Sequence, residues 1–218
     1  MLAHELKNPL MSSQLALSSI QKRLDPQDPV LQRAASIQSS LDEIDRIIER
    51  CVEADSFEHG QAPIKLATFS LDQLINQLES GQNTERLYVI QRGIDSSPLI
   101  QSDPQYVLII LKNLVSNALK YSPPDTLVEL LIRPAHQNIG AGLLFSISNE
   151  VGAAGLPDPA RMFERYYRGE GALSQSGAGL GLWLAQEMAG NLGTVIEAQM
   201  SEHKISFSFF LPLKPASA

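Results

Sequence analysis

The sequence predicts two parts: an all-α helical hairpin, followed by an α+β sandwich in which a mixed sheet carries helices on one face. In residues 1–58 the apolar positions recur every three or four residues, which is the period of helices that pack along one side. Beyond residue 62, short strand-like runs alternate with helix-like segments, and two strand-like runs close the chain. Gly60 and Pro63 interrupt the pattern between the two parts, so we expect domains at 1–58 and 62–218.

Composition narrows the class of protein. Of the 218 residues 44% are hydrophobic, which is enough to bury a core in one or two domains. A net charge of −7 and an isoelectric point near 5.1 give no basic surface for nucleic acid and argue against docking on an anionic membrane. The single Cys51 excludes an internal disulfide and suits a reducing compartment. Because there is no signal peptide and no apolar run of about 18 residues, we expect a soluble cytoplasmic chain.

The hairpin is predicted from two apolar stripes that a turn separates. The first stripe places a helix at residues 1–24, with a bend after Pro9. It consists of Leu2, Leu6, Leu10, Leu17, Ile20 and Leu24. Two prolines within residues 25–29 predict a turn, after which Asp28 caps the second helix and Pro29 takes its first position. The second stripe consists of Val30, Ala34, Ile37, Leu41, Ile44, Ile48 and Cys51.

Two such helices leave an apolar seam that is too large to remain in water. Pairing two hairpins into a dimeric four-helix bundle buries this seam, so we expect a homodimer. The alternative is that the hairpin packs on the second domain of its own chain. Because the apolar stripe already runs at Leu2, we expect the chain to be the C-terminal portion of a longer protein.

The second part is predicted element by element from periodicity, caps and turns. Its predicted strands cover residues 64–69, 87–91, 98–101, 127–133, 143–148, 194–200 and 204–211. Its predicted helices cover residues 71–79, 103–121, 159–166 and 180–191. Ser70 is the expected cap of the first of these helices, and Asp103-Pro104 opens the second. Residues 169–179 are expected to form a loop, rich in glycine and serine, that closes over a ligand.

The first candidate for chemistry is His4. Asn8 follows it by one helical turn, and Glu5 is its neighbour. His4 lies about 200° around the helix from Leu2 and from Leu6, so it points away from the apolar seam. An exposed histidine beside a carboxylate can keep one nitrogen nucleophilic, although an ordinary solvated histidine is the plainer alternative. A zinc site would need a second histidine where Asn8 stands.

The helix at 103–121 carries a second candidate. Asn113, Asn117 and Lys120 are spaced by four and then three residues, so they share one face, and Tyr121 ends the row. Amide oxygens suit Mg²⁺ and an ammonium group suits phosphate. The alternative is a solvated polar face.

The third candidate is a glycine cluster that leads directly into a helix. Gly177, Gly179 and Gly181 let the backbone approach phosphate oxygens, and the helix start supplies free N–H groups. The cluster is neither a Walker P-loop nor a Rossmann fingerprint, because the lysine and the glycine spacing of those motifs are missing.

Four segments together resemble sensor histidine kinases of two-component systems. Residues 4–10 (His-Glu-Leu-Lys-Asn-Pro-Leu) are similar to the phosphoacceptor box, and residues 113–122 are similar to the asparagine box. Residues 162–168 (Met-Phe-Glu-Arg-Tyr-Tyr-Arg) are similar to the phenylalanine box, and residues 177–182 to the second glycine box. Four motifs in the family's order are far more specific than any one of them.

The resemblance implies a dimerisation and histidine-phosphotransfer hairpin followed by an ATP-binding domain of the gyrase, Hsp90, kinase and MutL type. It implies ATP and Mg²⁺ as cofactors, a response regulator receiver domain as partner, and the cytoplasmic portion of a membrane-anchored sensor. By resemblance, His4 Nε2 attacks the γ-phosphate, and Glu5 orients the imidazole and helps to take its proton. Arg168 would neutralise phosphate charge during transfer, and Asn8 would align water for removing phosphate from the regulator.

The same resemblance implies the cofactor-binding residues. Asn117 would hold Mg²⁺ with help from Asn113, Lys120 would contact phosphate, and Tyr121 would lie near the sugar or base. The whole implied set is Asn113, Asn117, Lys120, Tyr121, Asn149, Gly155, Arg168, Gly177, Gly179, Leu180 and Gly181.

One motif departs from the family's pattern. The first glycine box, Asp-x-Gly-x-Gly, is expected after the strand at 143–148, and its aspartate accepts a hydrogen bond from the adenine amino group. Counting back from Phe163 puts Asn149 at the position of the aspartate, and Gly155-Leu156-Pro157 resembles the tail of the box, displaced by two residues. The amide oxygen of Asn149 still accepts this bond, but the lost charge costs about 1 kcal/mol, which is several-fold in affinity.

Two functions from different classes therefore follow. The first is an ATP-dependent kinase, and the second is a signalling module with a decayed nucleotide site that acts as phosphotransfer intermediate, phosphatase or docking scaffold. Asn117, Lys120 and the second glycine box favour the kinase. A hydrolysing ATPase of the same fold is disfavoured, because such enzymes usually carry a glutamate where Asn113 stands, and an amide is a poor general base.

Overall fold

The computed structural model describes residues 2–25, 28–58, 64–80, 85–94, 96–137, 140–172 and 177–213. These residues form two compact units, one built from the first two helices and the other from the remaining elements. The helical unit comes first in the chain, and a mixed-sheet α+β unit follows it, in agreement with the fold class that the sequence predicts at this level.

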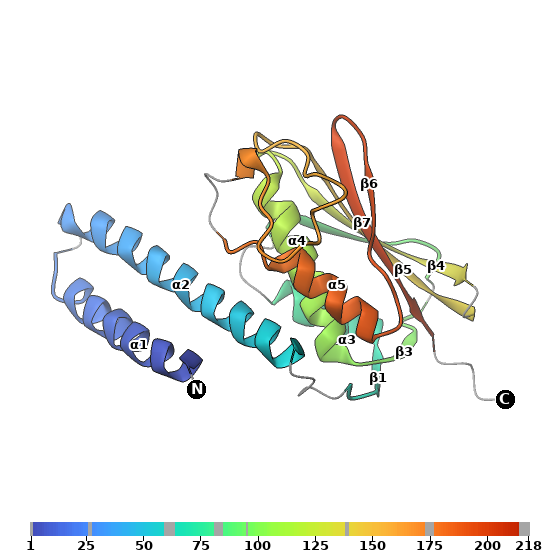
Figure 1. The fold of residues 1–218 in the computed structure, drawn as a ribbon, viewed down its shortest axis with the longest axis horizontal. Helices are drawn as coiled ribbons and strands as arrows, with labels where there is room; N and C mark the ends of the chain where they lie inside the picture. The colour runs from blue at the N-terminus through green and yellow to red at the C-terminus, as the bar shows by residue number, and fades with distance from the viewer. Residues whose placement is uncertain are drawn as a thin grey trace. The chain divides into compact units, whose positions relative to one another are not determined.

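The helical unit is a hairpin of α1 (Leu2–Gln21) and α2 (Val30–Glu58), which pack on each other (Figure 1). Asp28 caps α2 as predicted, because its Oδ1 accepts a hydrogen bond from the Val30 N–H at 2.8 Å. Between the helices, Gln14 Nε2 donates to Asp42 Oδ1 at 3.1 Å. α1 continues through Pro9 and ends at Gln21, before the predicted end at residue 24.

The apolar stripes of the hairpin divide into a buried part and an exposed part. Leu10 and Leu17 of α1 and Ala34 and Ile48 of α2 are buried within the unit. Val30, Ile37 and Ile44 keep 46%, 52% and 46% of their surface exposed. These three residues are seven apart, so they form one line along α2. The predicted stripe residues Leu2, Leu6 and Cys51 have side chains outside the described set.

Among the described residues, the α+β unit contains a five-stranded sheet with strand order β2-β4-β5-β7-β6. Its strands are β2 (Leu87–Gln91), β4 (Val128–Gln137), β5 (Gly140–Glu150), β6 (Glu197–Met200) and β7 (Lys204–Pro212). β2 runs parallel to β4 and the other neighbours are antiparallel, so the sheet is mixed, as predicted. β1 (Ala67–Ser70) and β3 (Leu99–Ser102) form a separate antiparallel pair.

The helices α3 (Leu71–Glu79), α4 (Pro104–Tyr121) and α5 (Gly181–Asn191) lie on one face of this sheet (Figure 1). α4 is the central helix, since it contacts α3, α5, β4 and β5. Alternate residues of β5 face the same side of the sheet, and Leu143, Phe145 and Ile147 among them are buried. Phe145 stacks on Phe209 of β7 with ring centroids 5.1 Å apart. The core therefore lies between the sheet and the helices, with α4 along its middle.

Local capping explains why the first two of these helices begin where they do. Ser70 and Gln73 form a capping box at the start of α3, with each side chain bonded to the other residue's backbone N–H. The carboxylate of Asp103 accepts from the N–H groups of Gln105 at 2.9 Å and Tyr106 at 3.3 Å at the start of α4. Burial raises the pKa of the Tyr106 hydroxyl, and the nearby Asp103 charge raises it further.

The prediction of a helix at 159–166 is wrong. The chain makes a series of turns there, and Tyr166 has a left-handed φ of 63°. The Asp158 N–H donates to the Tyr167 hydroxyl at 3.2 Å, and the Arg161 guanidinium lies 4.9 Å from the centre of the Tyr167 ring. These contacts fold the segment back on itself, whereas a helix would hold Asp158 and Tyr167 about 13 Å apart.

Several strand boundaries also differ from the prediction. β1 begins at Ala67 and not at residue 64, β4 continues to Gln137, and β5 extends from Gly140 to Glu150. β6 begins at Glu197 and not at residue 194, because α5 uses two N–H groups that would otherwise join the strand ladder: Ile196 N–H donates to Gln186 Oε1 at 3.2 Å, and Thr194 N–H donates to the Ala189 carbonyl at 2.9 Å. The predicted loop at 169–179 contains a short 3₁₀ helix, Glu170–Ala172. Residues 173–176 of this loop lie outside the described residues.

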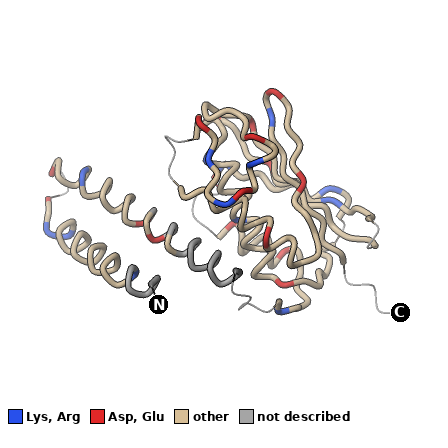
Figure 2. Tube along the Cα trace, viewed as in Figure 1, with Lys and Arg blue, Asp and Glu red and all other residues tan. Residues whose placement is uncertain are grey.

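Charged residues of both signs are interspersed along the described parts of the two units (Figure 2). No helix among the described residues is both long enough and apolar enough to cross a membrane.

Candidate functional site

The amide row predicted on α4 is present. Asn113 is buried, with 6% of its surface exposed, and its Nδ2 donates to the Ile109 carbonyl at 2.9 Å. Asn117 and Lys120 are half-buried, so the row runs from the core toward the surface. Lys120 Nζ lies 5.0 Å from the centre of the Tyr121 ring, which is a cation–π distance. The row therefore offers amide groups at its inner end and a positive charge at its outer end.

The first residue of α5 lies against this row. A Cβ atom built on Gly181 would stand 3.1 Å from Asn113 Oδ1, 3.5 Å from Asn117 Nδ2 and 3.6 Å from Asn117 Oδ1. The two amides therefore converge on a space that any side chain at Gly181 would fill. The start of α5 also presents backbone N–H groups that have no partner within the helix. Amide oxygens are suitable ligands for a magnesium ion, and the N–H groups at the helix start are suitable donors to phosphate. Together they fit a magnesium ion with phosphate.

The loop after β5 is joined to the end of α4. The Gly152 N–H donates to the Tyr121 carbonyl at 3.0 Å. A Cβ atom on Gly152 would stand 2.4 Å from the Tyr121 carbonyl oxygen, so only glycine permits this approach. No sequence motif marks Gly152, because its spacing from Asn149 does not match the family's glycine box.

Asn149 lies near the end of β5, on the side of the strand that faces the helices. It is buried, with 3% of its surface exposed, and its Nδ2 donates to the Glu150 carbonyl at 2.7 Å. This bond uses the nitrogen of the amide and leaves its oxygen as an acceptor, which is the role the sequence predicts for it.

Several predicted glycine positions have backbone conformations that favour glycine. Gly177 and Gly179 lead into α5 with φ values of 120° and 69°. Gly155 has a φ of 70° and closes a turn in which its N–H donates to the Gly152 carbonyl at 3.0 Å. Leu180 stands directly before α5 and is buried.

The structure places two arginines in the segment that follows β5. Arg168 Nη2 donates to the Ala172 carbonyl at 2.6 Å, so the group predicted to neutralise phosphate charge contacts the 3₁₀ turn. The Arg165 guanidinium lies 5.0 Å from the centre of the Tyr166 ring and 5.1 Å from that of Trp183 in α5. The Trp183 contact joins this segment to the helix that begins with Gly181, and sequence analysis missed it.

The predicted phosphoacceptor belongs to the other unit. His4 and Glu5 lie in α1, but their side chains are outside the described set. Asn8 is exposed on the same helix, and its carbonyl accepts a hydrogen bond from Ser12 Oγ at 3.0 Å. The roles predicted for His4, Glu5 and Asn8 thus stay predictions.

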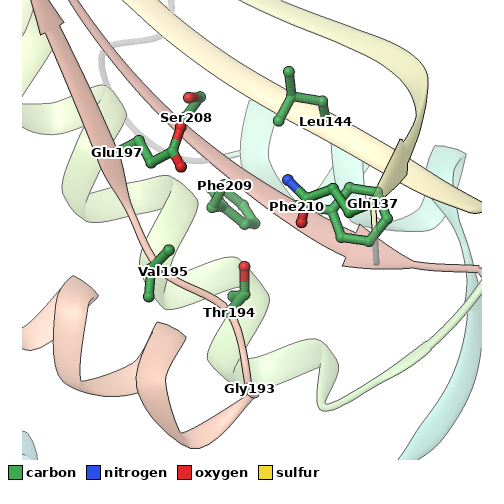
Figure 3. Close-up of a pocket in the computed structure, with 9 residues that line it drawn as sticks. All are labelled: Gln137, Leu144, Gly193, Thr194, Val195, Glu197, Ser208, Phe209 and Phe210. Carbon is green, nitrogen blue, oxygen red and sulfur yellow. The ribbon is translucent and has the colours of Figure 1, made fainter. Parts of the chain in front are cut away.

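Among the described residues, no three or more His, Cys, Asp or Glu side chains cluster closely enough to hold a metal. A cavity of about 440 Å³ lies among the loop after α5 and strands β4 to β7 (Figure 3). Its polar lining residues are Gln137, Thr194, Glu197 and Ser208, and none of the predicted site residues takes part.

Comparison with known proteins identifies the α+β unit. Residues 102–215 match the family model described as "Histidine kinase-, DNA gyrase B-, and HSP90-like ATPase". The chain is 25% identical, over 215 residues, to the swarming motility regulation sensor protein RssA of Serratia marcescens, covering 96% of this chain and 45% of RssA. It is 23% identical, over 194 residues, to the sensor-like histidine kinase SenX3 of Mycobacterium tuberculosis, covering 87% of this chain and 46% of SenX3.

Among solved structures, full-length ShkA in complex with AMPPNP superposes on the whole of this chain with a TM-score of 0.71 and 19% sequence identity. The chain covers 46% of ShkA, and it spans about half the length of the two sensor proteins above. At this identity the likeness to ShkA establishes the fold.

Proposed function

Because the chain belongs to the family of histidine kinase-, DNA gyrase B- and HSP90-like ATPases, we propose that it is the catalytic core of a sensor histidine kinase. In this proposal it phosphorylates His4 with ATP and passes the phosphoryl group to an aspartate of a response regulator. The observation that carries the proposal is the approach of Gly181 to the amides of Asn113 and Asn117. A side chain at this position would fill the space in which magnesium and phosphate are proposed to lie.

The residues of the α+β unit divide the work of binding. ATP supplies the γ-phosphoryl group, and Mg²⁺ supplies positive charge between the phosphates. The amide oxygens of Asn113 and Asn117 are the proposed metal ligands, and Lys120 is the proposed phosphate contact. Asn149 Oδ1 would accept from the adenine amino group, and Tyr121 would lie beside the sugar or base.

The loops around this row would complete the phosphate site. The backbone at Gly177, Gly179, Leu180 and Gly181 presents N–H groups at the start of α5, where the helix dipole favours negative charge. Gly155 would shape the loop beside the base, and Arg168 would offset phosphate charge during transfer.

The helical unit would supply the acceptor. We assign residues 1–58 as the phosphotransfer hairpin and residues 62–218 as the ATP-binding domain. His4 Nε2 is the proposed nucleophile, and the carboxylate of Glu5 would orient the imidazole and help to take its proton. Asn8 would align a water molecule for removing phosphate from the regulator. The exposed line Val30, Ile37 and Ile44 favours a homodimer through this hairpin. The proposed location of the chain is the cytoplasm.

A second candidate function is supported by Asn149. A neutral amide, already bonded to the Glu150 carbonyl, is a weaker partner for adenine than a free carboxylate. A chain that fails to bind nucleotide would act as a phosphotransfer intermediate, a phosphatase or a docking scaffold.

The test is incubation of the purified chain with Mg²⁺ and ATP labelled in its γ-phosphate. The expected product is a phosphoprotein that is labile in acid and stable in alkali, which is typical of phosphohistidine. His4→Gln should abolish labelling but keep nucleotide binding, whereas Asn117→Ala should abolish both. Labelling that persists in His4→Gln would refute the assigned acceptor.

Calorimetric titration with a non-hydrolysable ATP analogue separates the two candidate functions. Binding that depends on Mg²⁺ supports the kinase. A folded chain that binds no analogue at millimolar concentration supports the module with a decayed site.

A further inference from the structure

The C-terminal turn of α4 carries two of the proposed nucleotide contacts, Lys120 and Tyr121. The last carbonyls of a helix lack partners within the helix, and a helix end without other partners frays. In α4, Ala118 O accepts from the Ser122 N–H at 3.0 Å, and Tyr121 O accepts from the Gly152 N–H at 3.0 Å. Ser122 Oγ also donates to the Leu119 carbonyl at 3.4 Å. Further hydrogen bonds to this turn come from a side chain far away in the sequence.

That side chain is Arg86. Its Nη1 donates to Ser122 Oγ at 3.1 Å, to the Pro123 carbonyl at 2.7 Å and to the Thr126 carbonyl at 3.1 Å. Its Nη2 donates to the carbonyl of Leu119. One guanidinium group thus bonds to the last turn of α4 and to the turn that follows it.

Arg86 is itself held in place by the sheet. It directly precedes β2, its side chain is half-buried, and its carbonyl accepts from the Val128 N–H at 2.8 Å, where β4 begins. The guanidinium therefore reaches α4 from a fixed point of the backbone. Its charge lies at the negative end of the helix dipole, and its planar fork can serve several acceptors at once.

We propose that Arg86 is a positioning residue of the nucleotide site: by fixing the last turn of α4 it sets where Lys120 and Tyr121 meet the nucleotide. The inference rests on the proposed function. Arg86 touches neither phosphate nor base in this proposal, and it acts through the helix end alone.

The test compares variants of the full chain for binding of Mg²⁺ with a non-hydrolysable ATP analogue, by calorimetry. Arg86→Gln removes the charge and most of the donors, and we expect an affinity about tenfold lower. Arg86→Lys keeps the charge but cannot span the acceptors, so its affinity should lie between that of the unaltered chain and that of Arg86→Gln. Arg92→Gln, at the other end of β2, changes an exposed arginine and should bind as the unaltered chain does.

A second control separates positioning from stability. Leu143→Ala removes a buried side chain of β5 and should lower the melting temperature without lowering affinity, when both are measured well below the melting temperature. Arg86→Gln should lower affinity at temperatures where circular dichroism shows it to be fully folded. If Arg86→Gln does not fold, Arg86→Lys carries the same comparison.

The outcomes are distinct. An unaltered chain that binds no nucleotide would overturn the proposed function and this inference with it. An unaltered chain that binds, together with Arg86 variants that are folded and bind equally well, would overturn this inference alone.

Discussion

Asn149 differs from an aspartate in two ways: one stabilises the fold, and the other weakens the proposed binding of adenine. Its amide nitrogen donates to the Glu150 carbonyl, and this bond stabilises the chain when no nucleotide is present. Its oxygen is a neutral acceptor, which is weaker than a carboxylate for an adenine amino group. Asn149 thus stabilises the fold through its nitrogen, but its oxygen binds adenine more weakly than a carboxylate would in the proposed complex.

Asn149→Asp should therefore destabilise the unliganded protein and strengthen nucleotide binding. A carboxylate cannot donate to the Glu150 carbonyl and would be buried, so we expect a loss of about 1–3 kcal/mol in the free energy of unfolding. An ATP analogue should restore stability, with a larger rise in melting temperature than in the unaltered chain. Thermal unfolding with and without the analogue checks both effects. Equal rises in the two proteins would contradict a role of residue 149 in binding adenine.

At the scale of elements, the site depends on how closely α5 approaches α4. The closest point is Gly181, where a Cβ atom would come within 3.1 Å of Asn113 Oδ1. Asn113 cannot easily give way, because its Nδ2 is bonded to the Ile109 carbonyl within the same helix.

Gly181→Ala should weaken Mg²⁺-dependent nucleotide binding several-fold and change stability little. Alanine is favoured over glycine in a helix by roughly 1 kcal/mol, which offsets the local crowding. Gly190→Ala is the matched control in the same helix, since nothing among the described atoms lies within 4 Å of a Cβ there. Titration of both variants with the ATP analogue measures the effect. Equal affinities would show that the space at Gly181 is not used.

Elements with strong local signals could be predicted from the sequence. α4 begins at Pro104 as expected, because the Asp103 cap and the proline act on their own neighbours. The helix predicted at 159–166 is wrong, since the shape of this segment depends on contacts of Tyr167 with Asp158 and Arg161. Local preference does not report such contacts.

The site residues also divide into those that a local sequence signal predicts and those that depend on distant contacts. Asn113, Asn117 and Lys120 could be placed on one face, because helical spacing is a local rule. Gly152 and Arg86 could not be found, because each acts on the end of α4 from another part of the chain. Their roles depend on the strand order of the sheet, including the parallel pairing of β2 with β4, which periodicity does not predict.

At the scale of the whole molecule, the hairpin leaves apolar surface that its own fold does not cover. Val30, Ile37 and Ile44 are exposed along one line of α2, and Met11, Leu15 and Ile20 are exposed on α1. This is the basis for proposing that two chains associate through their hairpins.

Ile37→Asp should then convert a dimer into a monomer. A carboxylate buried in an apolar seam costs several kcal/mol, so the dissociation constant should rise at least a hundredfold. Sedimentation over a range of concentrations measures the change. Leu127→Asp alters a leucine of the α+β unit that is also exposed, and it should leave the dimer intact. An unaltered chain that is a monomer at every concentration would contradict the proposed association.

The contact of Arg165 with Trp183 has an optical consequence. Trp183 is the single tryptophan of the chain, and the guanidinium lies 5.1 Å from the centre of its ring. Indole emission responds to the charge and polarity near the ring, so all tryptophan fluorescence of the chain originates where the segment after β5 meets α5. The chain therefore carries a built-in spectroscopic reporter, which follows movement of that segment without any added dye.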